Sequence, residues 1–290
     1  MRRILISGRT GQVGYELERS LQGLGEVIAL DRSQMDLSNL QQVRDVIRSI
    51  KPTLIINPAA YTAVDQAERE PELALRINGE APGVMAEEAK KLGATLIHYS
   101  TDYVFDGSKD IPYLETDPTC PLNVYGSSKL AGEQAIQASG VAHLILRTSW
   151  VYSTHGKNFL LTMRRLAQER DALNIVSDQF GAPTWSRTIA DTTAHIVAQS
   201  LATADQQAWW DKHSGLYHLT AQGKTTWFGF AEAIMAHASV TKKPRLTPIL
   251  ASEYPVPAQR PANSVLSSQK LMATFCGLPN WQDALMLCQN

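Results

Sequence analysis

A tyrosine and a lysine able to do acid–base chemistry lie four positions apart in the chain, at Tyr125 and Lys129. On a helix, residues four apart share one face, so the phenol and the ammonium can point to one place. A free phenol has a pKa of about 10, and a nearby cation lowers that pKa by favouring the phenolate. The pair therefore predicts a group that protonates a carbonyl oxygen while hydride reaches the carbon. Ordinary surface helices show the same spacing, so the interpretation depends on neighbouring motifs.

A glycine-rich turn follows the first apolar run, Ile4 to Ile6, and precedes a helical pattern that reaches Leu24. Glycines allow a tight turn and a close approach to a diphosphate, and the helix N-terminus favours anions. The spacing is G-x-x-G-x-x-G, and Asp31 follows the second strand at the distance of a ribose-binding acid. The turn therefore predicts dinucleotide binding through Gly8, Arg9, Thr10, Gly11, Gln12, Val13 and Gly14.

The sequence leaves the cofactor open between NADPH and NADH. Asp31 favours the free 2′-hydroxyl of NADH, whereas Arg9 and Arg32 could meet a 2′-phosphate or be solvated surface charges. After the third strand, small residues would let the backbone lie against a flat ligand, although a plain turn explains them nearly as well. These residues are Ala59, Ala60 and the adjoining Tyr61.

A second hydroxyl is expected beside the phenol. The run His98 to Phe105 ends an apolar strand and contains Thr101. Because ligands lie beyond the carboxyl ends of parallel strands, Thr101 should reach the same crevice as Tyr125. Thr101 would then hydrogen-bond the substrate oxygen, and Lys129 would hold the nicotinamide ribose.

Composition narrows the class of ligand. The 290 residues are 44% hydrophobic and 19% charged, which fits a globular protein of one large domain or two smaller ones. A formal net charge of -1 without a basic block predicts no positively charged surface for nucleic acid or anionic membrane, so we expect a small-molecule ligand. Three cysteines without C-x-x-C, and no signal-peptide pattern, predict a cytoplasmic protein with reduced thiols. The seven histidines show no metal-ligand spacing, and we predict no metal site from them.

Short apolar runs alternate with helical patterns in the first half of the chain, which predicts an α/β fold with a Rossmann-like, doubly wound parallel sheet. The expected strands are residues 4–6, 27–30, 54–56, 95–97 and 144–146, and Ser38 with Gln41 predicts a capping box for the helix after the second strand. Pro82-Gly83 interrupts a long helical pattern over residues 72–92, so we expect a kink or broken turn near Ala81.

We assign residues 1–150 to the dinucleotide-binding domain and residues 151–290 mainly to a smaller substrate-binding α/β lobe, with some later segments returning to the first domain. Helices over 158–168, 187–200 and 226–238, the last capped by Thr225 or Thr226, and a strand over 216–219 are placed in the lobe. Five prolines between Pro244 and Pro261 predict an extended loop. Arg260 could reach the diphosphate of a nucleotide sugar or be held by a neighbouring carboxylate.

In this order, the glycine turn, Ser100-Thr101-Asp102 and Tyr125-x-x-x-Lys129 resemble the extended short-chain dehydrogenase/reductase family. Further stretches narrow the resemblance, over essentially the whole chain, to the dTDP-4-dehydrorhamnose reductases. These stretches are residues 57–65, 100–105, 147–152, 178–184 and 260–264.

This resemblance implies reduction of the C4 ketone of dTDP-6-deoxy-L-lyxo-4-hexulose to dTDP-L-rhamnose, with NADPH or NADH as hydride donor, for cell-surface polysaccharide. It makes Tyr125 the proton donor, Lys129 its partner and Thr101 the third member of a triad. The residues expected at the substrate are Thr101, Asp102, Val104 and Trp150. The match to the cofactor shell includes Gly11, Gln12, Val13, Asp31, Asp36, Leu37, Ala59, Ala60, Tyr61 and Tyr99.

Other activities on this fold require different residues. Related dehydratases carry Thr-Asp-Glu, and here the third position is Tyr103. Epimerases need a further acid or base, for which Cys120 is the nearest candidate, although an unpaired cysteine is usually inert. A non-catalytic nucleotide-binding regulatory protein, or a reductase of another nucleotide 4-keto sugar, remains as an alternative.

Some relatives hold Mg at a dimer interface through two glutamates. Glu16 matches the first, but the second position is Arg187, which makes Mg doubtful and leaves the protein a monomer or a homodimer.

Overall fold

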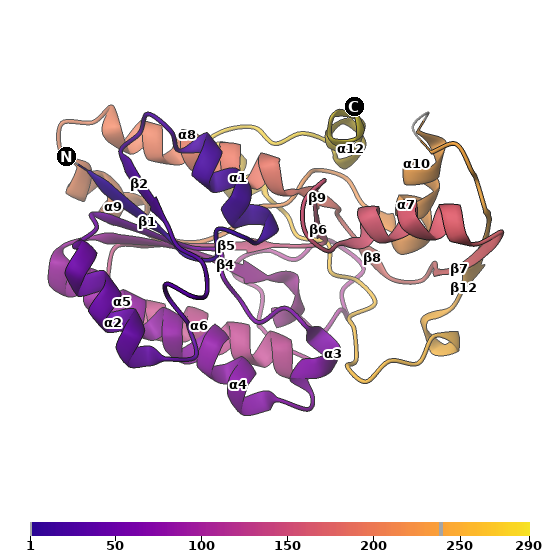
Figure 1. The fold of residues 1–290 in the computed structure, drawn as a ribbon, viewed down its shortest axis with the longest axis horizontal. Coiled ribbons are helices and arrows are strands. Elements are labelled where there is room, and N and C mark those ends of the chain that lie inside the picture. The colour runs from indigo at the N-terminus through magenta and orange to yellow at the C-terminus, as the bar shows by residue number, and fades with distance from the viewer. Residues whose placement is uncertain (1, 238–239) are drawn as a thin grey trace.

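The computed structural model describes residues 2–237 and 240–290, and its centre is a parallel six-stranded sheet (Figure 1). The strands are β1 (Arg3–Ile6), β2 (Glu26–Ala29), β3 (Leu54–Asn57), β4 (Thr95–Thr101), β5 (His143–Thr148) and β10 (Gly215–His218). They lie in the order β10-β5-β4-β3-β1-β2. The chain order reverses between β1 and β3, and the carboxyl ends of the strands at such a reversal are where open parallel sheets bind ligands. This confirms the doubly wound α/β fold.

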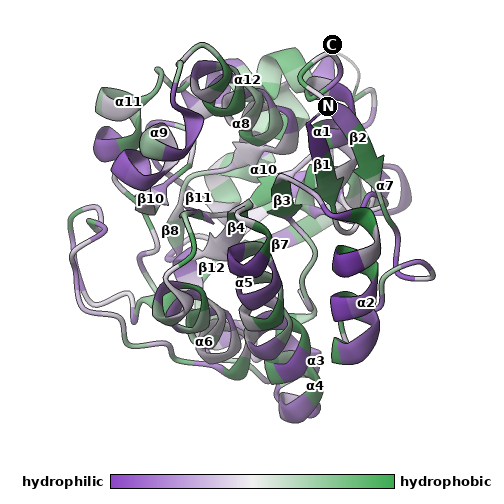
Figure 2. Ribbon diagram, turned by 90° about the vertical axis from the view of Figure 1, so that its left-hand side faces the viewer, coloured by the Kyte–Doolittle hydropathy of each residue, from purple (hydrophilic) through white to green (hydrophobic). Residues whose placement is uncertain are grey.

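Side chains of the central strands alternate between two layers of helices, which is why their sequences are apolar throughout. Ile4 and Ile6 face α1 (Gln12–Ser20) and α8 (Ser186–Leu201), whereas Leu5 faces the opposite layer. That layer holds α2 (Leu40–Ile50), α5 (Ala81–Leu92) and α6 (Val124–Ser139). Figure 2 shows hydrophilic and hydrophobic residues alternating along α2 and α5, as expected for helices with one buried face.

Two helix ends differ from the sequence prediction. Helix α1 ends at Ser20, and the chain reaches Leu24 through a turn. The cap of α2 is Asn39, whose side chain accepts from the backbone N–H of Gln42 at 3.1 Å, so the predicted capping box at Ser38 is wrong. The Ser38 hydroxyl instead donates to Asp36, which forms a local turn before the helix.

The expected break near Ala81 is a change of helix type. Helix α4 (Pro71–Leu75) runs through a π-helical segment, Arg76–Glu80, directly into α5. Pro82 has no N–H to donate to the carbonyl of Asn78, and a π-helical turn accommodates that loss without breaking the helix. The Asn78 carbonyl lies against α6, where a Cβ on Gly132 would be 2.2 Å from it.

The second half of the chain forms a smaller lobe around Tyr152, Phe230 and Trp281. Its elements are α7 (Phe159–Glu169), α10 (Trp227–Ala236), α12 (Trp281–Gln289), the parallel pair β7 (Ala172–Val176) and β12 (Arg245–Ile249), and the short pairs β6 (Val151–Tyr152) with β9 (Thr184–Trp185) and β8 (Phe180–Gly181) with β11 (Thr225–Thr226). Strand β12 lies inside the predicted proline-rich loop, which corrects that prediction. Pro248 fits there because β12 pairs on one side only.

Two segments that we placed in the lobe belong to the sheet domain. Helix α8 packs on α1, and β10 pairs with β5 from Gly215 to His218. Helices α9 (Gln206–His213) and α11 (Gln269–Thr274) lie beside them, and α3 (Val64–Ala67) follows β3. Thr226 caps α10 through the N–H of Gly229, as predicted; the expected helix end at Ala238 lies outside the described residues.

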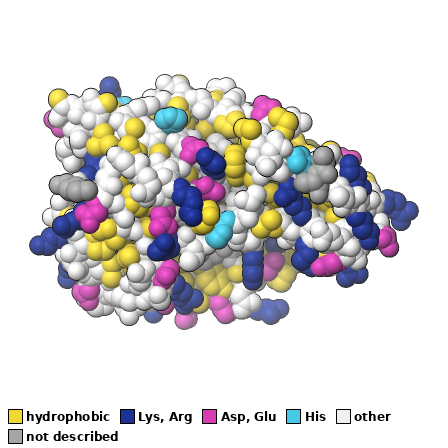
Figure 3. Space-filling model, turned by 45° about the horizontal axis from the view of Figure 1, so that its top comes forward, with side chains coloured by type: hydrophobic (Ala, Val, Ile, Leu, Met, Phe, Trp, Pro, Cys, Tyr) yellow, Lys and Arg dark blue, Asp and Glu magenta, His cyan; other side chains and the backbone are white. Residues whose placement is uncertain are grey.

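The surface mixes charges of both signs: Figure 3 shows Lys and Arg side chains interspersed with Asp and Glu over one face. Within residues 2–237 and 240–290, no helix is long and apolar enough to cross a bilayer.

Candidate active site

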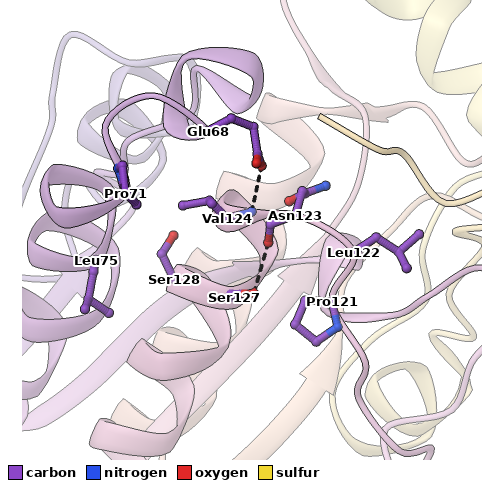
Figure 4. A pocket seen from close by; sticks show the side chains of 9 residues that line it. All are labelled: Glu68, Pro71, Leu75, Pro121, Leu122, Asn123, Val124, Ser127 and Ser128. Atoms are coloured by element: carbon purple, nitrogen blue, oxygen red, sulfur yellow. Dashed lines mark hydrogen bonds between the residues drawn. The ribbon is translucent and has the colours of Figure 1, made fainter. Parts of the chain in front are cut away.

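The first turn of α6 is held in place from three sides, and it carries Tyr125. Asn123 caps the helix by accepting from the N–H of Gly126 at 2.8 Å. The carboxylate of Glu68 accepts from the N–H of Val124 at 2.9 Å, which places a negative charge at the helix N-terminus (Figure 4). A Cβ at Gly126 would be 2.2 Å from the carbonyl oxygen of Tyr103, so only glycine allows this approach.

A cavity of about 440 Å³ lies against the outer side of this turn. Figure 4 shows Pro71 and Leu75 of α4 across from Ser127 and Ser128 of α6. Thr101 and Tyr125 are not among the residues that line it. The cavity therefore separates α4 from the helix N-terminus and does not contain the hydroxyls expected to do chemistry.

Thr101 and Tyr125 meet at the carboxyl end of β4. The Thr101 hydroxyl donates to Asp102 at 3.0 Å and accepts from the backbone N–H of Tyr103 at 3.2 Å. The phenol of Tyr125 also interacts with this hydroxyl, which lowers the pKa of the phenol. Burial raises the pKa of Tyr125 to about 12, more than the Thr101 hydrogen bond lowers it. The phenol is therefore protonated near neutral pH and able to donate.

Lys129 lies one turn further along α6, and its ammonium points to β4. Its Nζ donates to the carbonyl oxygen of Tyr99 at 2.6 Å and lies 3.1 Å from Nε2 of His98. Burial lowers the pKa of Lys129 to about 7. This differs from the expectation that Lys129 lowers the pKa of Tyr125, because burial controls both groups and the nearest partners of the ammonium are on β4.

Asp102 directly follows the strand and is 3% exposed. Its Oδ1 accepts from Thr101, and the nearby Ser264 side chain lowers the pKa of the carboxyl, but Oδ2 makes no hydrogen bond of ordinary geometry among the described residues. Burial raises the pKa of this carboxyl to about 7. A buried oxygen without a partner costs free energy, so this atom is a ready acceptor for a ligand hydroxyl beside Thr101.

The glycine turn has the shape that a diphosphate requires. Gly8 adopts φ +60°, and a Cβ on Gly14 would be 2.2 Å from the carbonyl oxygen of Gly8. Helix α1 begins after Gly11 without a side-chain cap or an acidic residue in its first turn, within the described chain. Its free N–H groups and positive dipole end therefore remain for an anion. The turn thus fits a dinucleotide, which Gly11, Gln12 and Val13 would hold at the diphosphate.

The charged residues expected at the adenosine end make local contacts. Asp31 accepts from the hydroxyl and the N–H of Ser33, which lower its pKa. Arg9 pairs with Glu18 at 2.8 Å, and Arg32 pairs with Asp36 at 3.3 Å. These pairs are partly exposed and weak, so both arginines can be recruited by a phosphate.

The loop after β3 is anchored by Asn78 of the π-helical segment. The Asn78 side chain accepts from the N–H of Tyr61 at 2.8 Å and donates to its carbonyl at 3.0 Å. Ala59 lies against Gly8, where an added Cβ would come within 2.9 Å.

Two other residues expected in the cofactor shell have their side chains packed in the interior. The Tyr99 hydroxyl hydrogen-bonds the hydroxyl of Thr193 on α8 at 2.7 Å, and Leu37 packs in the core on the α2 side.

Trp150 joins the sheet domain to the lobe in a strained backbone conformation. Its φ is +47°, which is rare for a bulky residue. Its ring stacks on Trp227 with centroids 3.6 Å apart, and an added Cβ at Gly181 would lie 2.3 Å from it. Val104, which was also expected at the substrate, is fully buried in a separate cluster with Phe105.

Arg260 is paired with a carboxylate, one of the two arrangements considered for it. Its guanidinium donates to both oxygens of Asp65, at 2.8 Å and 3.1 Å, and to the carbonyl of Ala258 at 3.0 Å. The guanidinium also lies near the phenol of Tyr103, whose ring meets the ring of Tyr125 edge to face with centroids 5.8 Å apart. Arg260 therefore lies close to Tyr125, with the ring of Tyr103 between them.

Glu16 of α1 lies near Arg187 of α8, which also approaches Asp191 at 3.7 Å. Burial raises the pKa of Glu16, and the charge of Arg187 opposes this shift. Within the described residues, no group of three metal-ligating side chains occurs.

Several residues around the site were not assigned roles by the sequence. Asn123 carried a local signal, because Asn before a helix is a preferred cap. His98 and Trp227 carried none, since their partners Lys129 and Trp150 are distant in the chain. Glu133 and Arg147 form a fully buried ion pair at 2.6 Å that fastens α6 to β5 and lies behind Lys129.

Known proteins resemble this chain along its whole length. A protein-family model described as "RmlD substrate binding domain" matches residues 1–290. A dTDP-4-dehydrorhamnose reductase of Burkholderia thailandensis is 50% identical, covering 99% of this chain and 97% of that protein. One from Escherichia coli K12 is 48% identical, covering 96% and 94% respectively.

A solved structure of dTDP-4-dehydrorhamnose reductase from Bacillus anthracis, in complex with NADP, superposes with a TM-score of 0.91 at 34% identity. The match covers 100% of this chain and 99% of that one. Because a family model and close relatives match along the whole length, the chain belongs to the RmlD substrate binding domain family, the family of the dTDP-4-dehydrorhamnose reductases.

Proposed function

We propose that the protein reduces the C4 ketone of dTDP-6-deoxy-L-lyxo-4-hexulose to give dTDP-L-rhamnose, with NADPH or NADH as the reductant. The observation that carries the proposal is the meeting of the Thr101 and Tyr125 hydroxyls at the carboxyl end of β4. This is where a parallel sheet with a glycine turn after β1 binds its ligands. The names of the similar proteins supply the sugar nucleotide.

Adding hydride and a proton across a C=O bond gives each side chain of the site a different role. Thr101 hydrogen-bonds the ketone oxygen, and Tyr125 donates its phenolic proton to that oxygen as charge develops. The raised pKa of Tyr125 keeps the proton in place until the ketone oxygen becomes basic. Asp102, beside Thr101, offers its unpartnered oxygen to a sugar hydroxyl. We propose that Trp150 contacts the sugar from the lobe.

A reduced nicotinamide bound beyond the strands would supply the hydride. The residues proposed to hold the dinucleotide are Gly8 to Gly14 at the diphosphate, Asp31, Arg32 and Asp36 at the adenosine, and Ala59 to Tyr61 with Lys129 toward the nicotinamide. Arg9 and Arg32 would donate to the 2′-phosphate of NADPH as readily as Asp31 would accept from the 2′-hydroxyl of NADH, so we propose that both cofactors serve.

The three cysteines are free, including the exposed Cys120, which suits a reducing compartment. We therefore propose that the reaction takes place in the cytoplasm.

The first prediction tests the proton donor. Purified protein should oxidise NADPH or NADH, followed by absorbance, when given the 4-keto sugar nucleotide. Tyr125→Phe keeps the ring but removes the proton, and we expect kcat to fall by about 10²-fold or more.

Tyr217→Phe is the matched control, because it removes the hydroxyl of a buried tyrosine on β10 that bonds the carbonyl of His213. Its rate should stay close to that of the parent. Equal rates for Tyr125→Phe and the parent would exclude Tyr125 as the donor. Binding of NADPH without any turnover would favour a non-catalytic nucleotide-binding protein instead.

A further inference from the structure

A line of buried polar side chains runs across the sheet and ends at Lys129. The Ser7 hydroxyl lies 2.6 Å from Oδ1 of Asn57, the Nδ2 of Asn57 lies 3.0 Å from Nδ1 of His98, and Nε2 of His98 lies 3.1 Å from Nζ of Lys129. Ser7 directly follows β1, the other three side chains come from β3, β4 and α6, and none of the four is more than 2% exposed. Water therefore does not compete for these contacts.

Both ends of this line adjoin residues proposed to act in the reaction. Ser7 immediately precedes Gly8 of the glycine turn, and its oxygen is 3.4 Å from the N–H of Ala59. At the other end, the carbonyl of Tyr99 takes one hydrogen of Nζ at 2.6 Å, and His98 lies where it can take a second. An ammonium has three hydrogens, so one remains for a ligand.

The charge on Lys129 determines which way the hydrogen bonds in this line must run. An ammonium only donates, so Nε2 of His98 must accept, and the proton of the neutral imidazole must be on Nδ1. Asn57 must then turn its amide oxygen to Nδ1, which reverses the amide orientation described above, and its Nδ2 would donate to the Ser7 hydroxyl. With the Nδ2 of Asn57 toward His98, the imidazole proton moves to Nε2, and Nζ can accept it only as a neutral amine.

We propose that His98 is a positioning residue for Lys129: its Nε2 accepts a hydrogen bond from the ammonium, and Asn57 selects the imidazole tautomer that makes this possible. This inference rests on the proposed reductase function for its effect on turnover. His98 keeps Lys129 charged at a site from which water is excluded, and directs the third N–H away from the strand toward the ligand.

The charges that face Lys129 allow this role. Burial, followed by the charge of Lys129, lowers the pKa of His98 well below its ordinary value, so the imidazole is a neutral acceptor. On α6, Glu133 opposes the lowering of the Lys129 pKa by burial, but its carboxylate is already bonded by Arg147 of β5 at 2.9 Å and 2.6 Å. His98 is therefore the side chain in hydrogen-bond contact with Nζ among the described residues.

Two substitutions of similar polarity separate the two ends of the imidazole. His98→Gln places an amide oxygen at the level of Nε2 and keeps an acceptor for Lys129, whereas His98→Asn reaches only the level of Nδ1 and keeps the contact with Asn57. We expect the Gln variant to stay within about threefold of the parent kcat and the Asn variant to fall by about tenfold or more, the scale of a charge-assisted hydrogen bond.

The pKa of Lys129 gives a second measurement that needs no substrate. It is followed by NMR of the labelled lysine side chain, assigned with Lys129→Arg. We expect the pKa in the Asn variant to be about one unit below that in the Gln variant, because the ammonium loses an acceptor. If the Asn variant does not fold, His98→Leu, which has no acceptor, replaces it.

Equal pKa values of Lys129 and equal rates in the Gln and Asn variants would overturn the proposal. A lower pKa in the Asn variant, with no turnover by the parent, would support the role of His98 and refute the reductase function. Normal turnover by the parent, with no difference between the variants, would refute the role of His98 and support the reductase function.

Discussion

Asp102 shows how burial controls a single residue of the site. Its carboxyl is 3% exposed, and one of its oxygens has no partner within the described residues. Burial raises its pKa to about 7, so the native protein holds this proton more tightly than the unfolded chain does. Native protein therefore binds more protons between about pH 4 and pH 7, and the stability due to this group is present below that window and lost as the pH rises through it.

The substitution Asp102→Asn should remove this pH dependence. We expect the free energy of unfolding of the Asn variant, relative to the parent, to increase between pH 4 and pH 8 by up to about 4 kcal/mol. Urea unfolding at several pH values measures it. The control is Asp110→Asn at an exposed carboxylate. A constant difference between Asp102→Asn and the parent across this range would contradict the raised pKa.

At the scale of elements, α6 is the helix that positions the side chains of Tyr125 and Lys129. Asn123 caps its first turn, and the buried pair of Glu133 and Arg147 fastens its middle to β5. Gly126 and Gly132 let it approach Tyr103 and the π-helical segment closely. Because these contacts occupy successive turns, the helix can neither rotate nor slide without breaking one of them, and Tyr125 stays aimed at Thr101.

Loss of the cap should weaken both the helix and the reaction. Asn123→Ala removes the acceptor for the N–H of Gly126, and we expect a loss of about 1 kcal/mol in unfolding free energy together with a several-fold lower kcat. Asn123→Asp keeps the cap acceptor but sets a carboxylate oxygen against the carbonyl of Gln259 in place of the Nδ2 donor, so it should retain more of the stability than Asn123→Ala.

Asn280→Ala provides the comparison, since Asn280 caps α12 in the same way through the N–H of Gln282. It should lower stability without lowering kcat. If Asn123→Asp lost as much stability as Asn123→Ala, the cap would not be the cause.

At the scale of the molecule, a late segment of the chain ties the lobe to the sheet domain. Arg260 binds Asp65 of α3, the carbonyl of Gln259 accepts from Asn123, and Asn263 donates to the carbonyl of Lys109. This segment therefore contacts the N-terminus of α6. It places the guanidinium of Arg260 so that the ring of Tyr103 lies between it and Tyr125. A substrate bound between the lobe and the sheet domain would contact this guanidinium.

Removing each partner of the Asp65 and Arg260 pair should separate two roles of the arginine. If Arg260 binds the diphosphate of the sugar nucleotide, Arg260→Ala should raise the KM for that substrate by about tenfold or more, the scale of a charge-assisted bond. Asp65→Ala leaves the guanidinium available and should raise this KM less. The KM for NADPH serves as the internal control, and equal effects of the two substitutions would restrict Arg260 to a structural role.

The sequence by itself determined the features that depend on nearby residues. Apolar runs bounded by glycine, proline, aspartate or asparagine predicted the strands β1 to β5, because a parallel strand is buried on both faces. The glycine turn after Ile6 and the four-residue spacing of Tyr125 and Lys129 are local patterns as well. They were enough to place the phenol and Thr101 at the same edge of the sheet.

Only the tertiary structure decided which distant groups share a buried environment. His98 reached Lys129, Trp150 stacked on Trp227, and β10 joined the sheet through contacts between residues far apart in the chain. The direction of the Tyr125 pKa also depended on the fold, because it reflects how much water and charge surround the phenol. Local spacing can bring a cation to the same helix face, but packing determines what the cation touches.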